Sequence, residues 1–193
     1  MTNDYRPVPD FFLVAISFEG GLGLLAVGLG SWLGYPPVDR IEWTLASSVL
    51  GIVYALPLIG LVWFALRIQW APLENIRRVL EETLVPLMQG VPLWKLAAIA
   101  AFAGFGEEML FRGVLQNWIA GLFVAHVGPY LGLAVASVVF GLLHSVNAAY
   151  AVLATLIGVY LGALWLVSGN LLVPAVVHAV YDFWAMLYLI RRC

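Results

Sequence analysis

Charged residues are scarce in this chain, and they are missing altogether from one long stretch of it. Only 10% of the 193 residues are Asp, Glu, Lys or Arg, whereas a soluble domain carries about 25%. None of these four residue types occurs between Gly113 and Tyr181, and that stretch is several times longer than the roughly 20 residues that one membrane crossing requires. The shortage excludes an ordinary water-soluble globule and indicates a protein that crosses a membrane several times.

Cysteine and basic tracts are rare as well. The one cysteine, Cys193, cannot form a disulfide within the chain, and it lacks the three following residues of a prenylation box. The formal net charge is -2, and the sequence contains no run of Lys and Arg that would neutralise successive phosphates. We therefore expect neither cysteine chemistry nor a nucleic-acid partner.

Hydrophobic residues make up 63% of the chain, and the mean hydropathy is +0.98. They gather in apolar segments at about 11–34, 43–66, 93–120, 129–146, 147–168 and 171–190. Lipid offers no partners to backbone groups, and the alternating pattern of a barrel strand is absent, so the segments should be helices. The sequence predicts an all-α fold, a polytopic transmembrane bundle of about six to seven membrane helices. The seventh arises if the third segment is broken near Gly104 and Gly106.

The one substantial polar stretch runs from Arg67 to Lys95 and has the pattern of an amphipathic helix. Apolar and charged residues alternate in it at helical spacing, with Leu73, Ile76, Leu80, Leu84 and Leu87 on one face and Glu74, Arg77, Arg78, Glu81 and Glu82 on the other. Such a helix is expected to lie on the membrane surface.

The basic residues predict the orientation of the chain. We expect a multi-pass cell-membrane protein with both termini in the cytoplasm. In this orientation most of the basic residues lie on the cytoplasmic side, as the positive-inside tendency prefers: Arg6, Arg67, Arg77, Arg78, Lys95, Arg191 and Arg192. The first apolar segment is too long for a cleavable signal and is read as a retained helix. No internal repeat or low-complexity linker divides the chain, so we expect residues 1–193 to form a single membrane domain.

Ionisable residues within apolar segments are costly, at about 2.5 to 3.5 kcal/mol for a charge at mid-helix. The second half of the chain nevertheless concentrates several of them: Glu107, Glu108, Arg112, His144, His178 and Asp182. Each pair alone is often structural, but their concentration in a region otherwise almost free of such groups indicates a site of chemistry. In the first apolar segment, Glu19 is either a buried functional acid or a group that reaches the interface.

Helical spacing separates the roles of the two glutamates. Glu108 and Arg112 share a helix face and predict an ion pair, which leaves Glu107 unpaired within its own helix. Glu107 is therefore the better candidate for a base that takes a proton from water. His144, on another helix, is a plausible second partner for that water.

His178 and Asp182 also lie one helical turn apart. Asp182 can accept a hydrogen bond from the imidazole and so aim its other nitrogen into the cavity. That nitrogen would serve as an oxyanion donor or as a metal ligand. Two histidines and a glutamate form a known catalytic zinc set, which here would be Glu107, His144 and His178, with the fourth position left for water. The residues leave both readings open, and the zinc-binding helix motif HExxH is absent.

The spacing of these residues resembles that of a known family. The motifs are EExxxR from Glu107 to Arg112, FxxxH from Phe140 to His144, and HxxxD from His178 to Asp182, in that order. They are similar to those of the CPBP family, the CAAX proteases and bacteriocin-processing enzymes also called the Abi family of intramembrane proteases. The resemblance covers roughly residues 93–190, which would form the catalytic core.

The resemblance implies a membrane-embedded endopeptidase acting on a membrane-associated peptide or protein. By position, Glu107 would activate water with help from His144, while His178 and Asp182 would border the oxyanion. Glu108 and Arg112 would support the site. Such families are described either as metalloproteases, with a divalent metal such as zinc, or as glutamate-based and metal-free enzymes.

One departure from the family pattern bears on the substrate. The eukaryotic-type prenyl-protein endopeptidases of the family carry Asn where this chain has Asp182, and an ionised aspartate cannot donate to an oxyanion. Asp182 would have to orient His178, bind a metal or be protonated. The HxxxD form fits bacterial members, so a farnesylated CAAX substrate is not implied directly.

Two functions from other classes fit the same polar cluster. A proton-coupled carrier would use the carboxylates and histidines as a relay, although the inverted repeats typical of carriers are absent. A catalytically silent membrane scaffold would use the cluster to hold its helices together.

Overall fold

The computed structural model describes residues 10–65 and 67–192, and in this part of the chain all regular structure is helical, without strands. The long helices are α1 (Phe11–Leu33), α2 (Leu45–Ala65), α3 (Ala71–Thr83), α5 (Leu93–Glu108), α7 (Gly128–Leu143), α8 (Ala148–Ser168) and α9 (Leu172–Arg192). Shorter helical pieces are η1 (Val38–Arg40), α4 (Val85–Met88), η2 (Met109–Gln116) and α6 (Asn117–Gly121). The all-α prediction is confirmed. The predictions about Arg6 and Cys193 concern residues outside the described ranges.

Four of the helices, α1, α2, α8 and α9, are long and apolar enough to cross a membrane. α7 is also apolar but shorter. The protein is therefore a multi-pass membrane protein. The expected total of six to seven membrane helices stays a prediction, because it depends on how α7 and the segment from α5 to α6 lie in the bilayer.

The third apolar segment does not break at its glycines. α5 is regular through Gly104 and Gly106, and η2 and α6 continue it without a loop. Both glycines instead permit close packing, since a Cβ atom on Gly104 would lie 2.6 Å from the carbonyl oxygen of Ala175 in α9, and one on Gly106 would overlap the carbonyl oxygen of Glu19 in α1. The expected break is therefore wrong, and α5 lies backbone to backbone between α1 and α9.

The helix changes its winding just after the two glutamates. η2 is a π-helix of 8 residues. Segments of this kind are rare in proteins, and those that occur often lie at functional sites. It presents two buried polar side chains to α8: Arg112 donates to the carbonyl of Gly158 at 3.1 Å, and Gln116 donates to that of Gly162 at 3.2 Å. These bonds fix the register of η2 against α8 in the core of the bundle.

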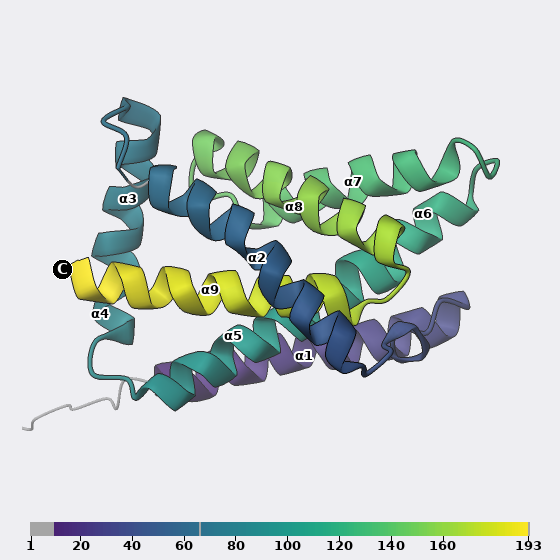
Figure 1. Ribbon diagram of the computed structural model, residues 1–193, viewed down its shortest axis with the longest axis horizontal. Coiled ribbons are helices and arrows are strands. Elements are labelled where there is room, and N and C mark those ends of the chain that lie inside the picture. Colours follow the sequence, from purple (N-terminus) through teal and green to yellow (C-terminus); the bar gives the residue numbers. More distant parts are fainter. Residues whose placement is uncertain (1–9, 66, 193) are drawn as a thin grey trace, which may run out of the picture.

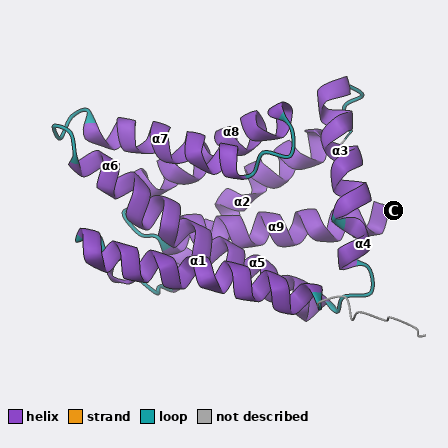
Figure 2. Cartoon of the chain, turned by 180° about the vertical axis from the view of Figure 1, so that it is seen from behind, coloured by secondary structure: helices purple, strands orange, loops and turns teal. Residues whose placement is uncertain are grey.

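The long apolar helices run roughly along the long axis of the molecule, and α3 crosses the bundle at the end where α9 terminates (Figure 1). The view from behind shows the same crossing (Figure 2). The amphipathic prediction is confirmed for α3, whose apolar residue Ile76 is 5% exposed. Leu87 departs from it with 43% exposure, because it lies past the end of α3 in α4, which begins with Val85 and Pro86.

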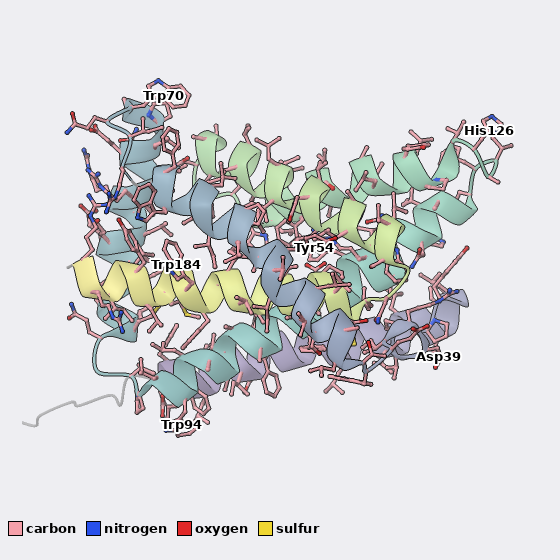
Figure 3. The ribbon with its side chains drawn as sticks, in the orientation of Figure 1. Asp39, Tyr54, Trp70, Trp94, His126 and Trp184 are labelled. Carbon is pink, nitrogen blue, oxygen red and sulfur yellow. The ribbon has the colours of Figure 1, made fainter. Side chains whose placement is uncertain are left out.

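Basic side chains are unevenly distributed between the two ends of the bundle. Nitrogen-tipped side chains gather around α3 and the end of α9, whereas Asp39 and His126 lie at the opposite end (Figure 3). Arg191 and Arg192 occupy the last turn of α9. The end crossed by α3 is thus the basic end of the molecule.

Candidate active site

A cavity of about 350 Å³ lies inside the bundle, between α3 and the long helices. Its wall is mostly apolar and is built from stripes of several helices. α1 contributes Phe11, Ala15 and Glu19, and α5 contributes Ile99, Ala103 and Glu107. Both stripes have helical spacing, and each ends on a carboxylate. α3 covers the cavity with Leu73, Ile76 and Leu80.

Glu107 and His144 face each other in this cavity. Oε2 of Glu107 lies 3.3 Å from Nε2 of His144, and both residues line the cavity. His144 reaches Glu107 because α7 is only 16 residues long and ends directly before it. The sequence-based expectation that Glu107 is unpaired within its own helix and meets His144 from another helix matches this geometry.

The tautomer of His144 follows from its second contact. Nδ1 lies 2.8 Å from the carbonyl oxygen of Phe140, and because a carbonyl can only accept, Nδ1 carries a proton. Nε2 and the Glu107 carboxylate then face each other, and their contact is attractive when one proton lies between them. The pair can therefore hold and pass a proton.

Phe140 explains the aromatic position of the FxxxH motif. It is 2% exposed, and its ring stacks on the imidazole of His144 with the centroids 4.2 Å apart. The guanidinium of Arg112 lies 4.6 Å from the centre of the same ring. Phe140 thus separates His144 from the buried arginine and fixes the imidazole plane.

Glu108 lies behind the cavity wall and joins two basic side chains. Its Oε1 atom accepts from Nη1 of Arg112 at 2.6 Å and from Nδ1 of His178 at 2.9 Å. All three side chains are buried, with exposures of 0% for Glu108, 1% for Arg112 and 2% for His178. The predicted pair of Glu108 and Arg112 is present, and its contact with His178 could not be read from spacing.

His178 is placed differently from the expectation. Its Nε2 atom lies 3.5 Å from Oδ2 of Asp182, as the one-turn spacing predicts. The other nitrogen, however, points at Glu108 and not into the cavity. The expectation of a free ring nitrogen is therefore wrong. The close packing of α5 on α9 at Gly104 brings Glu108 within reach of His178.

The six predicted residues separate into two groups. Glu107, His144 and Asp182 line the cavity, whereas Glu108, Arg112 and His178 do not. Polar residues that the site prediction did not include also line it: Glu19, Tyr150 and Tyr181. The position of Glu19 agrees with the alternative of an acid inside the bundle. Tyr150 shares a stripe of α8 with Leu153, Ala154 and Ile157, a helical pattern that marks a buried face but not a site.

The residues present do not fit a metal site. Among the described residues, no group of three or more His, Cys, Asp and Glu side chains is placed to hold a metal ion. The proposed set of Glu107, His144 and His178 fails because both nitrogens of His178 already face carboxylates. A zinc ligand needs a free nitrogen lone pair aimed at the ion.

Comparison with known protein families gives a match. The sequence model of a family described as Type II CAAX prenyl endopeptidase Rce1-like matches residues 89–184. No curated protein and no solved structure matches the chain. The matched range includes all six predicted residues but neither α1 nor α3, which supply part of the cavity wall.

Proposed function

Since residues 89–184 belong to the Rce1-like type II CAAX prenyl endopeptidases, a family of peptide-bond hydrolases, we propose that this protein is an intramembrane endopeptidase with Glu107 and His144 as its catalytic pair. The observation that carries the proposal is the contact of these two side chains in a mostly apolar cavity inside the bundle. Burying two ionisable groups in such surroundings costs free energy, so their presence there indicates a function.

Glu107 acts as the general base. Its carboxylate lines the cavity, with Oε2 3.3 Å from Nε2 of His144, so a water molecule in the cavity can donate to it. Glu107 takes one proton from this water as the water oxygen attacks the carbonyl carbon of the scissile bond. The carbonyl π electrons move onto the oxygen and form the tetrahedral intermediate.

His144 acts as the general acid. When the proton of the pair resides on Nε2, the imidazolium can give it to the leaving nitrogen as the carbon–nitrogen bond breaks. Glu107 then returns the proton taken from water to His144, which restores the starting state. One proton is taken from water and one is given to the leaving nitrogen, so Glu107 and His144 together end with the number of protons they had at the start.

Glu108, Arg112 and His178 support the site from behind. Arg112 and His178 both donate to Glu108, and Arg112 also donates to α8. Together these contacts tie α5, η2, α8 and α9 to one another. They fix the backbone that carries Glu107 without exposing a charge to the cavity.

The substrate is a membrane-associated peptide or protein with an apolar segment. The apolar stripes from α1, α3 and α5 would bury such a segment. The basic end of the molecule, crossed by α3, would face the cytoplasm in accordance with the positive-inside tendency. A substrate would then approach from the cytoplasmic side of the membrane.

The test is cleavage of quenched peptides by purified protein in lipid nanodiscs, with prenylated and unprenylated versions of each peptide. Wild type is compared with Glu107→Gln and with Glu82→Gln, which makes the same chemical change at an exposed position of α3. We expect cleavage by wild type and Glu82→Gln and none by Glu107→Gln. Equal behaviour of wild type and Glu107→Gln toward every cleaved peptide would reject the proposal. The two peptide series show whether a prenyl group is required.

A further inference from the structure

Peptide hydrolysis by the proposed route needs a hydrogen-bond donor for the oxyanion. Negative charge develops on the carbonyl oxygen when water attacks, and one well-placed donor contributes about 10²- to 10³-fold to kcat. His178 does not supply it, because its nitrogens face Glu108 and Asp182. Asp182 also lines the cavity, but a carboxylate group accepts hydrogen bonds and does not donate them.

Tyr150 brings a neutral donor into the same cavity. It lies in the first turn of α8, where its backbone N–H donates to the side chain of Asn147 at 2.9 Å, and this N-cap fixes the start of the helix. Leu153, Ala154 and Ile157 continue its stripe along the cavity wall. Tyr150 is the polar member of that stripe.

Tyr150 lines the cavity together with Asp182 and Glu107, the two carboxylates of the reaction region. The second tyrosine of the cavity, Tyr181, stacks its ring on the buried His178, with the centroids 5.2 Å apart and the planes at 15°. That stacking assigns Tyr181 a packing role beside His178. Of the two tyrosines, we therefore take Tyr150 as the candidate donor.

We propose that the hydroxyl of Tyr150 donates the hydrogen bond that stabilises the oxyanion and that Tyr150 is thus a further catalytic residue. This inference rests on the proposed peptidase function. The hydroxyl keeps its proton throughout. The electron pair that moves onto the carbonyl oxygen during attack returns to carbon when the carbon–nitrogen bond breaks, and the hydrogen bond is strongest between these two events.

The first test is Tyr150→Phe, which removes one oxygen and keeps the ring. We expect kcat to fall about 10²- to 10³-fold with little change in KM, because the donor acts mainly in the transition state. Tyr160→Phe is the matched control on α8, since its hydroxyl bonds to the carbonyl of Tyr54, away from the cavity. Its kcat should stay within about threefold of wild type. Tyr181→Phe tests the other hydroxyl of the cavity.

The second test adds a donor at a neighbouring position. Asp182→Asn places an amide N–H at the cavity wall, so in the Tyr150→Phe background it should restore kcat at least about tenfold. A merely structural role of Tyr150 does not predict this rescue. Thermal unfolding of each variant in detergent shows whether the folded fraction is unchanged.

The outcomes separate the two proposals. If wild type cleaves peptides and Glu107→Gln does not, while Tyr150→Phe retains wild-type kcat, the role of Tyr150 is overturned and the peptidase stands. A loss of kcat in Tyr181→Phe in place of Tyr150→Phe, or a loss that Asp182→Asn does not relieve, also overturns it. If cleavage by wild type is independent of Glu107, the proposed function itself fails.

Discussion

Glu108 and His178, which are 70 positions apart in the chain, meet at 2.9 Å between Oε1 and Nδ1. The same oxygen also accepts from Arg112. Glu107, the preceding residue, points instead to the cavity and to His144. Adjacent glutamates of one helix thus have different surroundings, and their substitution should have different consequences.

Glu107→Gln should abolish cleavage and leave the fold intact. The variant loses the base that takes a proton from water, an effect worth about 10²- to 10⁴-fold in kcat. Its thermal unfolding temperature should equal or exceed that of wild type, because a buried charge has been removed. Cleavage kinetics and unfolding in detergent check both statements. A large drop in unfolding temperature would instead support the scaffold alternative.

Glu108→Gln should mainly lower stability. An amide leaves Arg112 and His178 buried without their carboxylate, and breaking a buried pair costs about 3 to 5 kcal/mol. The unfolding temperature should therefore fall well below that of Glu107→Gln under identical conditions. Equal unfolding temperatures for the two variants would contradict the assignment of Glu108 as the partner of both basic side chains.

A chelator should leave cleavage unchanged. Both nitrogens of His178 face carboxylates, so the sequence-predicted set of Glu107, His144 and His178 lacks its third ligand. Incubation with EDTA should alter kcat less than about twofold, and added zinc should not increase it. Loss of activity with EDTA that zinc restores would show that His178 turns away from Glu108 in the working enzyme.

Glu19→Met should stabilise the protein. Oε2 of Glu19 is buried, and no hydrogen-bond partner for it is found among the described residues; an unsatisfied buried polar atom costs about 1 to 3 kcal/mol. Methionine keeps the length of the side chain and removes the carboxyl group. A rise in unfolding temperature checks the expectation. A fall accompanied by loss of cleavage would place Glu19 in the catalytic machinery.

Sequence periodicity predicted those parts of the fold and site that depend on one helix at a time. Apolar runs located the helices, and one-turn spacing predicted the contacts of Glu108 with Arg112 and of His178 with Asp182. The amphipathic stripe of α3 was also visible, although the cavity beneath it was not. These features are local, so spacing alone is sufficient to find them.

Contacts between helices were harder to predict. The glycines before Glu107 suggested a break in the helix, yet they permit close packing of α5 on α1 and α9. This packing lets Glu108 reach His178, which no one-dimensional pattern encodes. The π winding of η2 was not predicted either, because hydrophobic periodicity does not separate one π segment from the α-helix on each side of it. Tyr150 was missed because tyrosine is common in apolar helices.

The order of the polar contacts along the chain has a consequence for biogenesis. The segment with Glu107, Glu108 and Arg112 leaves the ribosome before the residues that bind its side chains in the finished protein, since Gly158 and His178 lie far downstream. At that stage Glu108 and Arg112 can neutralise only each other. The segment therefore enters the bilayer with an incomplete set of partners, and the site is completed only when α9 has been synthesised. A nascent chain arrested before α9 should remain a substrate for membrane quality control.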